Sequence, residues 1–458
     1  TLLQGFFGIS ESDAFLWTGL ALVGVVIYVS FSGLKGVVYT DVFQFILAMC
    51  GSIVLAIYVL RAPEIGGLAG IKEALPEETF NFLPAVGEGS SGGGYQISLA
   101  SFLAFFGMVW WTSWYPGAEP GGGGYSAQRM LSTKDERSSF LASAVFQIGH
   151  YAVRPWPWII VALSAIVLYS SKGDVASSAP DFITYECLTQ QQNCEVLDAA
   201  QQAELDQWTA EWAPVYGEQL PEALKYQRDY RFGYIFLMRD FMPKGLLGML
   251  LASFFAAYMS TISTQLNWGA SYLINDFYLR FITPNAPRKK SLAMSRAVTL
   301  ALAIAGLLVT SFMDSIAGVW QFIMECGAGL GLVLILRWYW WRINAWAEIA
   351  ATIAPFIAYA IAHYALDWVF PNSFFFTVAF TTVSWIVVMY ATSPEPSSTL
   401  RTFYETVRPG GAWKPVEWKT GEYDGPKGPS TLVLVFQWLI GIGLVYGALF
   451  AVGALLWS

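Results

Sequence analysis

Long apolar runs recur along the whole chain, separated by polar connectors. Crossing about 30 Å of hydrocarbon takes a helix of roughly 20 residues, and each run approaches or exceeds that length. The runs number ten, at residues 14–32, 42–60, 98–116, 139–169, 245–272, 293–312, 317–338, 346–367, 374–392 and 432–457. They predict an all-α, multi-pass membrane protein with about ten transmembrane helices, forming a single transmembrane domain over residues 1–458.

Three connectors are longer than the others. Residues 61–97 end in a glycine-rich stretch that is typical of a flexible loop. Residues 171–231 mix Gln, Glu, Asp and Ala with Trp208 and Trp212, and we expect a small helical cap there. Residues 393–431 contain six prolines and predict a linker before the last span.

Composition supports a membrane protein. Of the 458 residues, 55% are hydrophobic and 13% are charged, whereas soluble domains carry roughly 25% charged residues. The formal net charge of -8 arises mostly in connector 171–231. An acidic balance of this kind gives no reason to expect a nucleic-acid partner, and the lipid bilayer is the expected surrounding.

The basic residues give an orientation. Connectors 33–41, 129–138, 280–296, 337–345 and 393–431 hold 16 of the 25 Lys and Arg residues. Because short connectors rich in Lys and Arg stay in the cytoplasm, we expect these five connectors inside the cell. Connector 171–231 and both ends of the chain then lie outside.

The third apolar run is followed by a segment that cannot continue a helix. After Tyr115 the chain runs through Pro116 to Gly124, with two prolines and five glycines. Irregular backbone at membrane depth occurs where protein buries it or water lines it, as in the broken helices of transporters. Glu119 within the break is then a candidate functional acid. Alternatively, the helix ends at Tyr115 and Glu119 is solvated in a loop.

The fifth apolar run carries small polar residues along one helical face. They recur at steps of three, four and seven residues: Ala257, Ser260, Thr261, Thr264, Trp268 and Ser271, with Ser263 and Asn267 beside them. Hydroxyl and carbonyl oxygens on one face suit a hard monovalent cation. The alternative is a packing face of small residues whose hydroxyls bond their own backbone, which is common in membrane helices.

The four cysteines fall into two classes. Cys50 and Cys326 lie in apolar runs, where a free thiol is usually a small hydrophobic group. Cys187 and Cys194 lie in the expected outer loop, where oxidising conditions permit a disulfide. The chain starts at Thr1 with a first crossing directed inward and no signal pattern, so we expect an N-terminal portion to be missing.

Other chemistries find little support in the sequence. The stretch Gly89 to Gly93 fits the G-x-S-x-G pattern of hydrolases, but without the strand and helix that expose a nucleophile. His150 and His363 are the only histidines, and no cysteine pair stands near them to complete a zinc site. We therefore expect no enzyme.

Three further stretches bear on the function: Gly33 to Gln44, Gln128 to Lys134 and Gly248 to Tyr278. They resemble signatures of the sodium/solute symporter family, which includes the sodium/glucose cotransporters and the proline permease, and the likeness covers roughly residues 1–370. The resemblance implies a LeuT-like bundle of two inverted five-helix repeats with broken helices. It also implies sodium-coupled symport by alternating access in the plasma (inner) membrane. On this register the first core helix is missing.

The resemblance also implies sodium ligands. The family's main sodium site falls on the Ala257 carbonyl and on the hydroxyls of Ser260 and Thr261. Its second sodium site, where present, falls on Asp41 and Ser263. The chemistry of both sets agrees with the family pattern, and sodium is the one ion expected.

The solute side departs from the sugar carriers. Their break carries amide or acidic side chains, whereas this chain has Gly121 to Gly124. The resemblance places the solute beside that break, near Trp114, Tyr115, Glu119, Gly122, His150, Arg154 and Gln321. A sugar, polyol or carboxylate remains possible. The alternative function is a channel or a membrane solute sensor built on the same scaffold.

Overall fold

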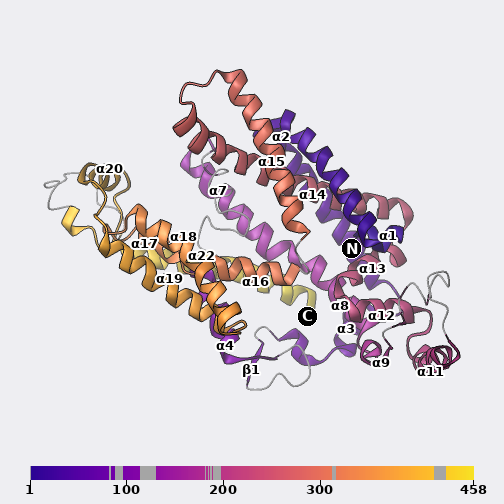
Figure 1. Cartoon of the computed structure of the whole chain (residues 1–458). Helices are drawn as coiled ribbons and strands as arrows, with labels where there is room; N and C mark the ends of the chain where they lie inside the picture. The colour runs from indigo at the N-terminus through magenta and orange to yellow at the C-terminus, as the bar shows by residue number, and fades with distance from the viewer. Residues whose placement is uncertain are drawn as a thin grey trace. The chain divides into compact units, whose positions relative to one another are not determined.

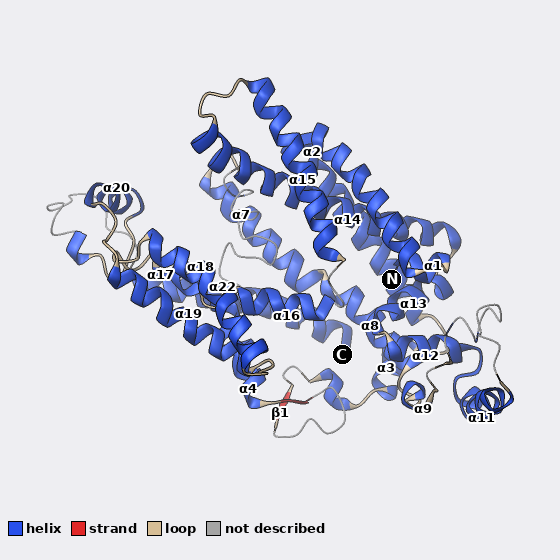
Figure 2. Ribbon diagram, viewed as in Figure 1, coloured by secondary structure: helices blue, strands red, loops and turns tan. Residues whose placement is uncertain are grey.

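The structure is a computed structural model that describes residues 2–81, 84–87, 96–113, 130, 132–180, 182–183, 185, 188, 198–311, 316–416 and 430–457. Side chains at 11, 31–38, 96, 316–317 and 431 are excepted. Helices dominate these residues (Figure 2). One pair of two-residue parallel strands, β1 (Ala85–Val86) and β2 (Gln96–Ile97), forms the only sheet in this part of the chain.

The chain divides into two compact units. Unit 1 comprises Thr1–Phe80, Ala144–Leu307 and Val445–Ser458. Its helices are α1 (Leu2–Phe7), α2 (Glu11–Leu60), α3 (Gly67–Ala74), η1 (Glu77–Phe80), η3 (Ile148–Val153), α8 (Pro155–Tyr169), α9 (Val175–Ser178), α11 (Ala199–Tyr216), η4 (Gly217–Gln219), α12 (Leu220–Arg228), η5 (Tyr230–Phe232), α13 (Gly233–Phe241), α14 (Lys244–Ser271), η6 (Tyr272–Ile282) and most of α15 (Arg288–Thr310) (Figure 1).

Unit 2 comprises Asn81–Ser143 and Leu308–Leu444. Its helices are α4 (Leu99–Phe102), η2 (Leu103–Val109), α5 (Trp110–Thr112), α16 (Ile316–Cys326), α17 (Leu330–Leu336), α18 (Ala345–Ala360), η7 (Ile361–Ala365), α19 (Asn372–Ala391) and α20 (Ser397–Val407). Three helices have residues in both units: α7 (Glu136–Gln147), α15, whose last three residues belong to unit 2, and α22 (Thr431–Trp457).

The predicted spans are present as apolar helices. In the described part of the chain, eight helical stretches are long and apolar enough to cross a membrane: Ser12–Ser30, Tyr39–Leu60, Glu136–Tyr169, Lys244–Ile282, Arg288–Thr310, Ala345–Ala365, Asn372–Ala391 and Leu432–Trp457. The broken pair α16 and α17 makes nine if it forms one span. The third predicted span corresponds to a shorter apolar helix, Leu99–Thr112. The prediction of an all-helical, multi-pass membrane protein is confirmed.

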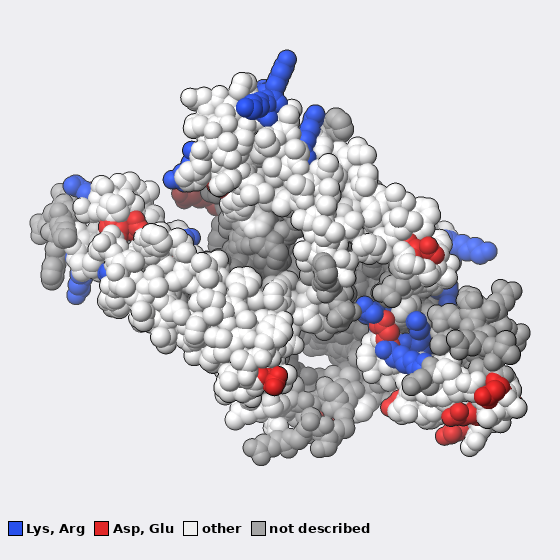
Figure 3. Space-filling view, in the orientation of Figure 1, with Lys and Arg blue, Asp and Glu red and all other residues white. Residues whose placement is uncertain are grey.

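Charged side chains are scarce on two of the membrane-spanning helices, α18 and α19. Figure 3 shows the surfaces of α18 and α19 almost without charged side chains along their length. The sequences of these two helices contain a single ionisable acid, Glu348, and no Lys or Arg. A helix surface without charged side chains is required for contact with hydrocarbon.

Helix α2 contains the first two predicted spans and bends between them. Its helical backbone continues through the connector predicted at 33–41. The Tyr28 and Thr40 hydroxyls are 3.0 Å apart. In a straight helix twelve residues rise about 18 Å, far beyond the reach of a tyrosine side chain. The helix must therefore fold back between these residues, which places its two halves as neighbouring spans along α14 (Figure 1).

The seventh predicted span is broken, which the apolar pattern did not reveal. Residues Gly318–Cys326 and Leu330–Leu336 form two helices bent by 44° at Gly327 to Gly329. Gly329 takes a φ of 92°, in the left-handed region that only glycine adopts at low cost. A Cβ atom there would lie 2.7 Å from the Thr381 side chain of α19. The tertiary contact and the backbone conformation both require glycine at this turn.

The cap expected over residues 171–231 is helical, as predicted. Helices α11 and α12 pack beside α8 and α13 in the hydrophobic core of unit 1, where Trp208 is buried. Arg239 of α13 bonds Glu222 at 2.8 Å and Tyr185 at 2.9 Å, and burial raises the pKa of Tyr185. Cys187 and Cys194 lie outside the described residues.

The linker predicted over 393–431 is partly folded. Helix α20 lies within it, and the Trp413 ring stacks on Phe403 at 5.3 Å. The Trp413 indole donates a hydrogen bond to the Trp338 carbonyl at 3.1 Å. This part of the linker is therefore anchored to the end of α17.

Candidate functional site

The seam between α2 and α14 in unit 1 brings together two predicted sodium ligands. The Ser260 hydroxyl donates to the Asp41 carboxylate at 2.5 Å. Ser263, with only 1% of its surface exposed, donates its hydroxyl to the Ser260 carbonyl at 3.0 Å. The family resemblance assigned Ser260 to the main site and Asp41 with Ser263 to a second one. Because Asp41 contacts Ser260 directly, the two candidate sites share that hydroxyl.

The other two members of the main candidate set lie on the exposed side of α14. Ala257 and Thr261 are both exposed, one helical turn apart. Between them, the Tyr258 hydroxyl donates to the Thr18 carbonyl of α2 at 3.3 Å. This contact fixes α14 against the first half of α2, just as Ser260 fixes it against the second half.

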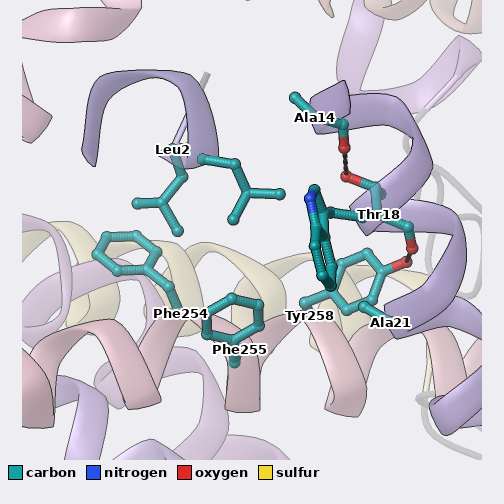
Figure 4. Close-up of a pocket in the computed structure, with 9 residues that line it drawn as sticks. Leu2, Ala14, Thr18, Ala21, Phe254, Phe255 and Tyr258 are labelled. Carbon is teal, nitrogen blue, oxygen red and sulfur yellow. Dashed lines mark hydrogen bonds between the residues drawn. The ribbon is translucent and has the colours of Figure 1, made fainter. Parts of the chain in front are cut away.

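A cavity of about 240 Å³ lies beside Tyr258 (Figure 4). Figure 4 shows Phe254, Phe255 and Leu2 around it, with the Thr18 hydroxyl directed at the Ala14 carbonyl, to which it donates at 2.7 Å. The lining is largely apolar, with the Trp17 indole as a further polar group, and the hydroxyls of Thr18 and Tyr258 already bond within the protein. It offers little to a polar solute.

The donor set of the seam fits a hard monovalent cation. It offers an acidic side chain, hydroxyls and a nearby helix carbonyl, all of them oxygen ligands. No group of three or more His, Cys, Asp or Glu side chains that could hold a metal ion occurs within the described residues. Oxygen ligands of this kind suit hard cations better than transition metals.

The basic pair predicted near the solute is mutually bonded. Arg154 Nη1 donates to His150 Nδ1 at 2.8 Å, which places the proton of a neutral His150 ring on Nε2. The Arg154 guanidinium also lies 4.5 Å above the Trp158 ring, and His150 stacks on Phe146 at 5.0 Å. His150 belongs to the π-helical turn η3, a backbone form that is frequent at functional sites.

In unit 2, Gln321 leads to a buried polar network that sequence reasoning missed. Gln321 Nε2 donates to Glu325 Oε1 at 2.9 Å, and Glu325 Oε2 lies 3.1 Å from His363 Nε2. The Glu325 side chain is 0% exposed. An acid inside an apolar run was the available signal for Glu325. Its partner His363 is 38 residues away, so its role could not be found from spacing.

The same network adjoins the end of the third predicted span. The Ser113 hydroxyl donates to the Met324 carbonyl at 2.8 Å, one residue before Glu325. Ser113 is the last described residue before the predicted break. Trp114, Tyr115, Glu119 and Gly122 themselves lie outside the described residues, so their positions stay predictions.

Comparison with known proteins identifies the family. A family model described as "Sodium:solute symporter family" matches residues 1–187 and 223–354, which is more than half of the chain. The chain belongs to the sodium:solute symporter family. The family resemblance inferred from the three signature stretches is therefore confirmed.

Individual relatives are distant. A sodium/glucose cotransporter of Vibrio parahaemolyticus is 22% identical over 380 residues, which cover 80% of this chain and 60% of that protein. The osmoregulated proline transporter OpuE of Bacillus subtilis is 32% identical over 111 residues, covering 23% of this chain and 22% of the relative. The Escherichia coli sodium/pantothenate symporter is 33% identical over 125 residues, 26% of each chain.

Among solved structures, a substrate-bound, outward-open Na⁺-coupled sialic acid symporter is similar, with a TM-score of 0.42 and 16% identity. The match covers 86% of this chain and 69% of that one. The chain spans less than two thirds of the length of the Vibrio cotransporter. The relatives are named for different small polar solutes: glucose, proline and pantothenate.

Proposed function

We propose that this protein is a sodium-coupled symporter of a small polar solute in the plasma membrane. The observation that carries the proposal is the contact between the Asp41 carboxylate and the Ser260 hydroxyl, between α2 and α14, in a member of a sodium symporter family. An acid and hydroxyls facing each other within apolar spans are costly to bury without a function. Binding of a cation offsets that cost.

Sodium is a transported substrate in this proposal. Asp41 and Ser260 supply a carboxylate and a hydroxyl from two helices, and Ser263 holds the Ser260 carbonyl through its hydrogen bond. The Ala257 carbonyl and the Thr261 hydroxyl lie on the neighbouring face of α14 and would complete the main site. Because these ligands come from different helices, binding ties α2 to α14 and favours one conformation over others.

The solute would bind near the broken spans. Helix ends at a break direct backbone dipoles and free N–H and C=O groups toward the bilayer midplane. Support comes from the bond between Ser113 and the Met324 carbonyl, which brings the start of the predicted break beside the polar residues Gln321 and Glu325. Sugars, polyols and carboxylates are all small polar solutes of the kind that such a site takes.

Sodium dependence of uptake tests the proposal. Ser260→Ala and Thr261→Ala should each raise the sodium concentration for half-maximal uptake, because each removes one of a few neutral oxygen ligands. Glucose, proline and pantothenate serve as labelled probes in proteoliposomes. Ser253→Ala is the matched control, since Ser253 lies on the same helix and its hydroxyl bonds only the Met249 carbonyl of that helix, at 2.9 Å.

Two outcomes would turn the proposal down. Unchanged sodium dependence in both variants would leave the serines and threonine of α14 as packing residues. A solute concentration inside the proteoliposomes that never rises above the concentration outside would identify a channel, because only coupled transport accumulates solute.

A further inference from the structure

One polar side chain of the seam between α2 and α14 has no role in the proposed function. Gln44 lies on the second half of α2, within the span Tyr39–Leu60. Its side-chain oxygen, Oε1, is buried and has no hydrogen-bond partner among the described residues. Burying an amide oxygen without a partner costs free energy, so this atom requires an explanation.

Helix geometry directs Gln44 toward α14. One face of α2 is formed by residues that recur at steps of three and four: Asp41, Gln44, Ala48, Gly51 and Leu55. Asp41 on this face contacts Ser260, and Leu55 is fully buried in the core of unit 1. The neighbouring residues on the other faces are apolar and exposed: Val42, Phe43, Phe45 and Ile46. Gln44 therefore belongs to the face that packs on α14.

Two contacts set the register between the helices. The Ser260 hydroxyl bonds Asp41, and a Cβ atom added to Gly51 would lie 2.8 Å from the Leu250 side chain. The two helices therefore run antiparallel, and the position of Gln44 on α2 lies at the level of Ala257 on α14. This stretch of α2 and the stretch of α14 opposite it are described throughout. Gln44 thus lies beside the Asp41–Ser260 contact, at the level of the carbonyl that would complete the main site.

A glutamine in a membrane span commonly serves as a hydrogen bond between helices. That role does not account for Oε1 of Gln44, which receives no hydrogen bond. Three serine hydroxyls on this side of α14 already donate elsewhere: Ser260 to Asp41, and Ser253 and Ser263 to carbonyls of α14 itself. An oxygen without a donor can instead face a cation, and amide oxygens are ordinary ligands of hard cations.

We propose that Gln44 Oε1 is a further sodium ligand beside Asp41 and Ser260. This role of Gln44 rests on the proposed function and adds to it a neutral oxygen from α2. Ser260 fits the same ion, because a hydroxyl that donates its hydrogen to Asp41 keeps its lone pairs. A neutral ligand completes the shell of oxygens around the ion without adding a second charge to a buried site.

Binding of radiolabelled sodium to the purified protein in detergent tests this role without a known solute. Gln44→Met keeps the length of the side chain and removes the oxygen, so sodium affinity should fall by about two- to ten-fold, the effect of losing one neutral contact. The unfolding temperature in sodium-free buffer should stay near the wild-type value, because methionine packs well among apolar side chains. Gln437→Met, the same change at an exposed position of α22, should leave sodium affinity unchanged.

Ser260→Ala separates the role of Gln44 from the proposed function. If Ser260→Ala weakens sodium binding and Gln44→Met does not, the seam binds sodium without Gln44 and the proposed ligand is overturned. If the wild-type protein shows no saturable sodium binding, the sodium site itself is turned down and Gln44 with it. If Gln44→Met does not fold, Gln44→Glu decides. It keeps an oxygen at this place and adds a charge, so it should bind sodium more tightly, and unchanged or weaker binding would overturn the proposal.

Discussion

At the scale of single residues, Asp41 is the side chain on which the sodium proposal depends most. It is the one acid at the seam, and its contact with Ser260 joins α2 to α14. Replacing it by asparagine keeps the shape and one oxygen ligand, removes the negative charge and exchanges the other oxygen for an NH₂ group. The effect of that change therefore reports the electrostatic share of cation binding.

We predict that Asp41→Asn weakens sodium binding. A hydrogen bond or ligand contact to a charged group contributes about 1.5–3 kcal/mol, which corresponds to roughly ten- to a hundred-fold in affinity. The half-maximal sodium concentration for uptake should rise by such a factor. Asp206→Asn, which removes an exposed carboxylate of the cap helix α11, should have no effect. Equal sodium dependence in the two variants would exclude Asp41 as a ligand.

At the scale of helices, a single added carbon atom in the turn between α16 and α17 should lower the stability of the protein. We predict that Gly329→Ala lowers the unfolding temperature, because the added Cβ lies 2.7 Å from Thr381 and the φ of 92° is strained for alanine. Such backbone strain costs about 1–3 kcal/mol. Gly441→Ala is the control: it lies in helix α22 with open space around it. A matching loss of stability in both variants would contradict the argument.

The helices also show what local sequence can and cannot predict. The ten apolar runs predicted helices well because hydrocarbon demands long stretches without charge. The connector at 33–41 has helical backbone, because it contains no proline and a glycine costs a helix only about 1 kcal/mol. The break at Gly329 could not be predicted from local sequence, because glycine is needed there to avoid the Thr381 side chain of another helix.

The candidate site likewise has a part that the sequence predicts and a part that it does not. Helical spacing predicted the polar face of α14, and the family resemblance implied which of its residues bind a cation; the contact of Ser260 with Asp41 across two helices could be predicted from neither. The network of Gln321, Glu325 and His363 depends on how α16 packs against the segment that carries His363. No local pattern encodes that packing, so the acid alone was visible in the sequence.

At the scale of the whole molecule, the sequence predicts which ends of the helices face the cytoplasm. Side-chain packing gives no information on this orientation. The bias of Lys and Arg toward alternate connectors places residues 393–431 inside and residues 171–231 outside. Five predicted spans separate Asp206 from Ser398. An odd number of crossings puts these two residues on opposite sides of the membrane.

Cysteine labelling in intact cells measures this arrangement. Cys50, Cys187, Cys194 and Cys326 are first replaced, and Asp206→Cys or Ser398→Cys is then introduced. Both positions are exposed, so access depends on the side of the membrane rather than on burial. We predict that an impermeant maleimide labels Asp206→Cys in intact cells and labels Ser398→Cys only after permeabilisation. The reverse pattern would invert the topology, and labelling of both from outside would mean that the five helices between them do not make an odd number of crossings.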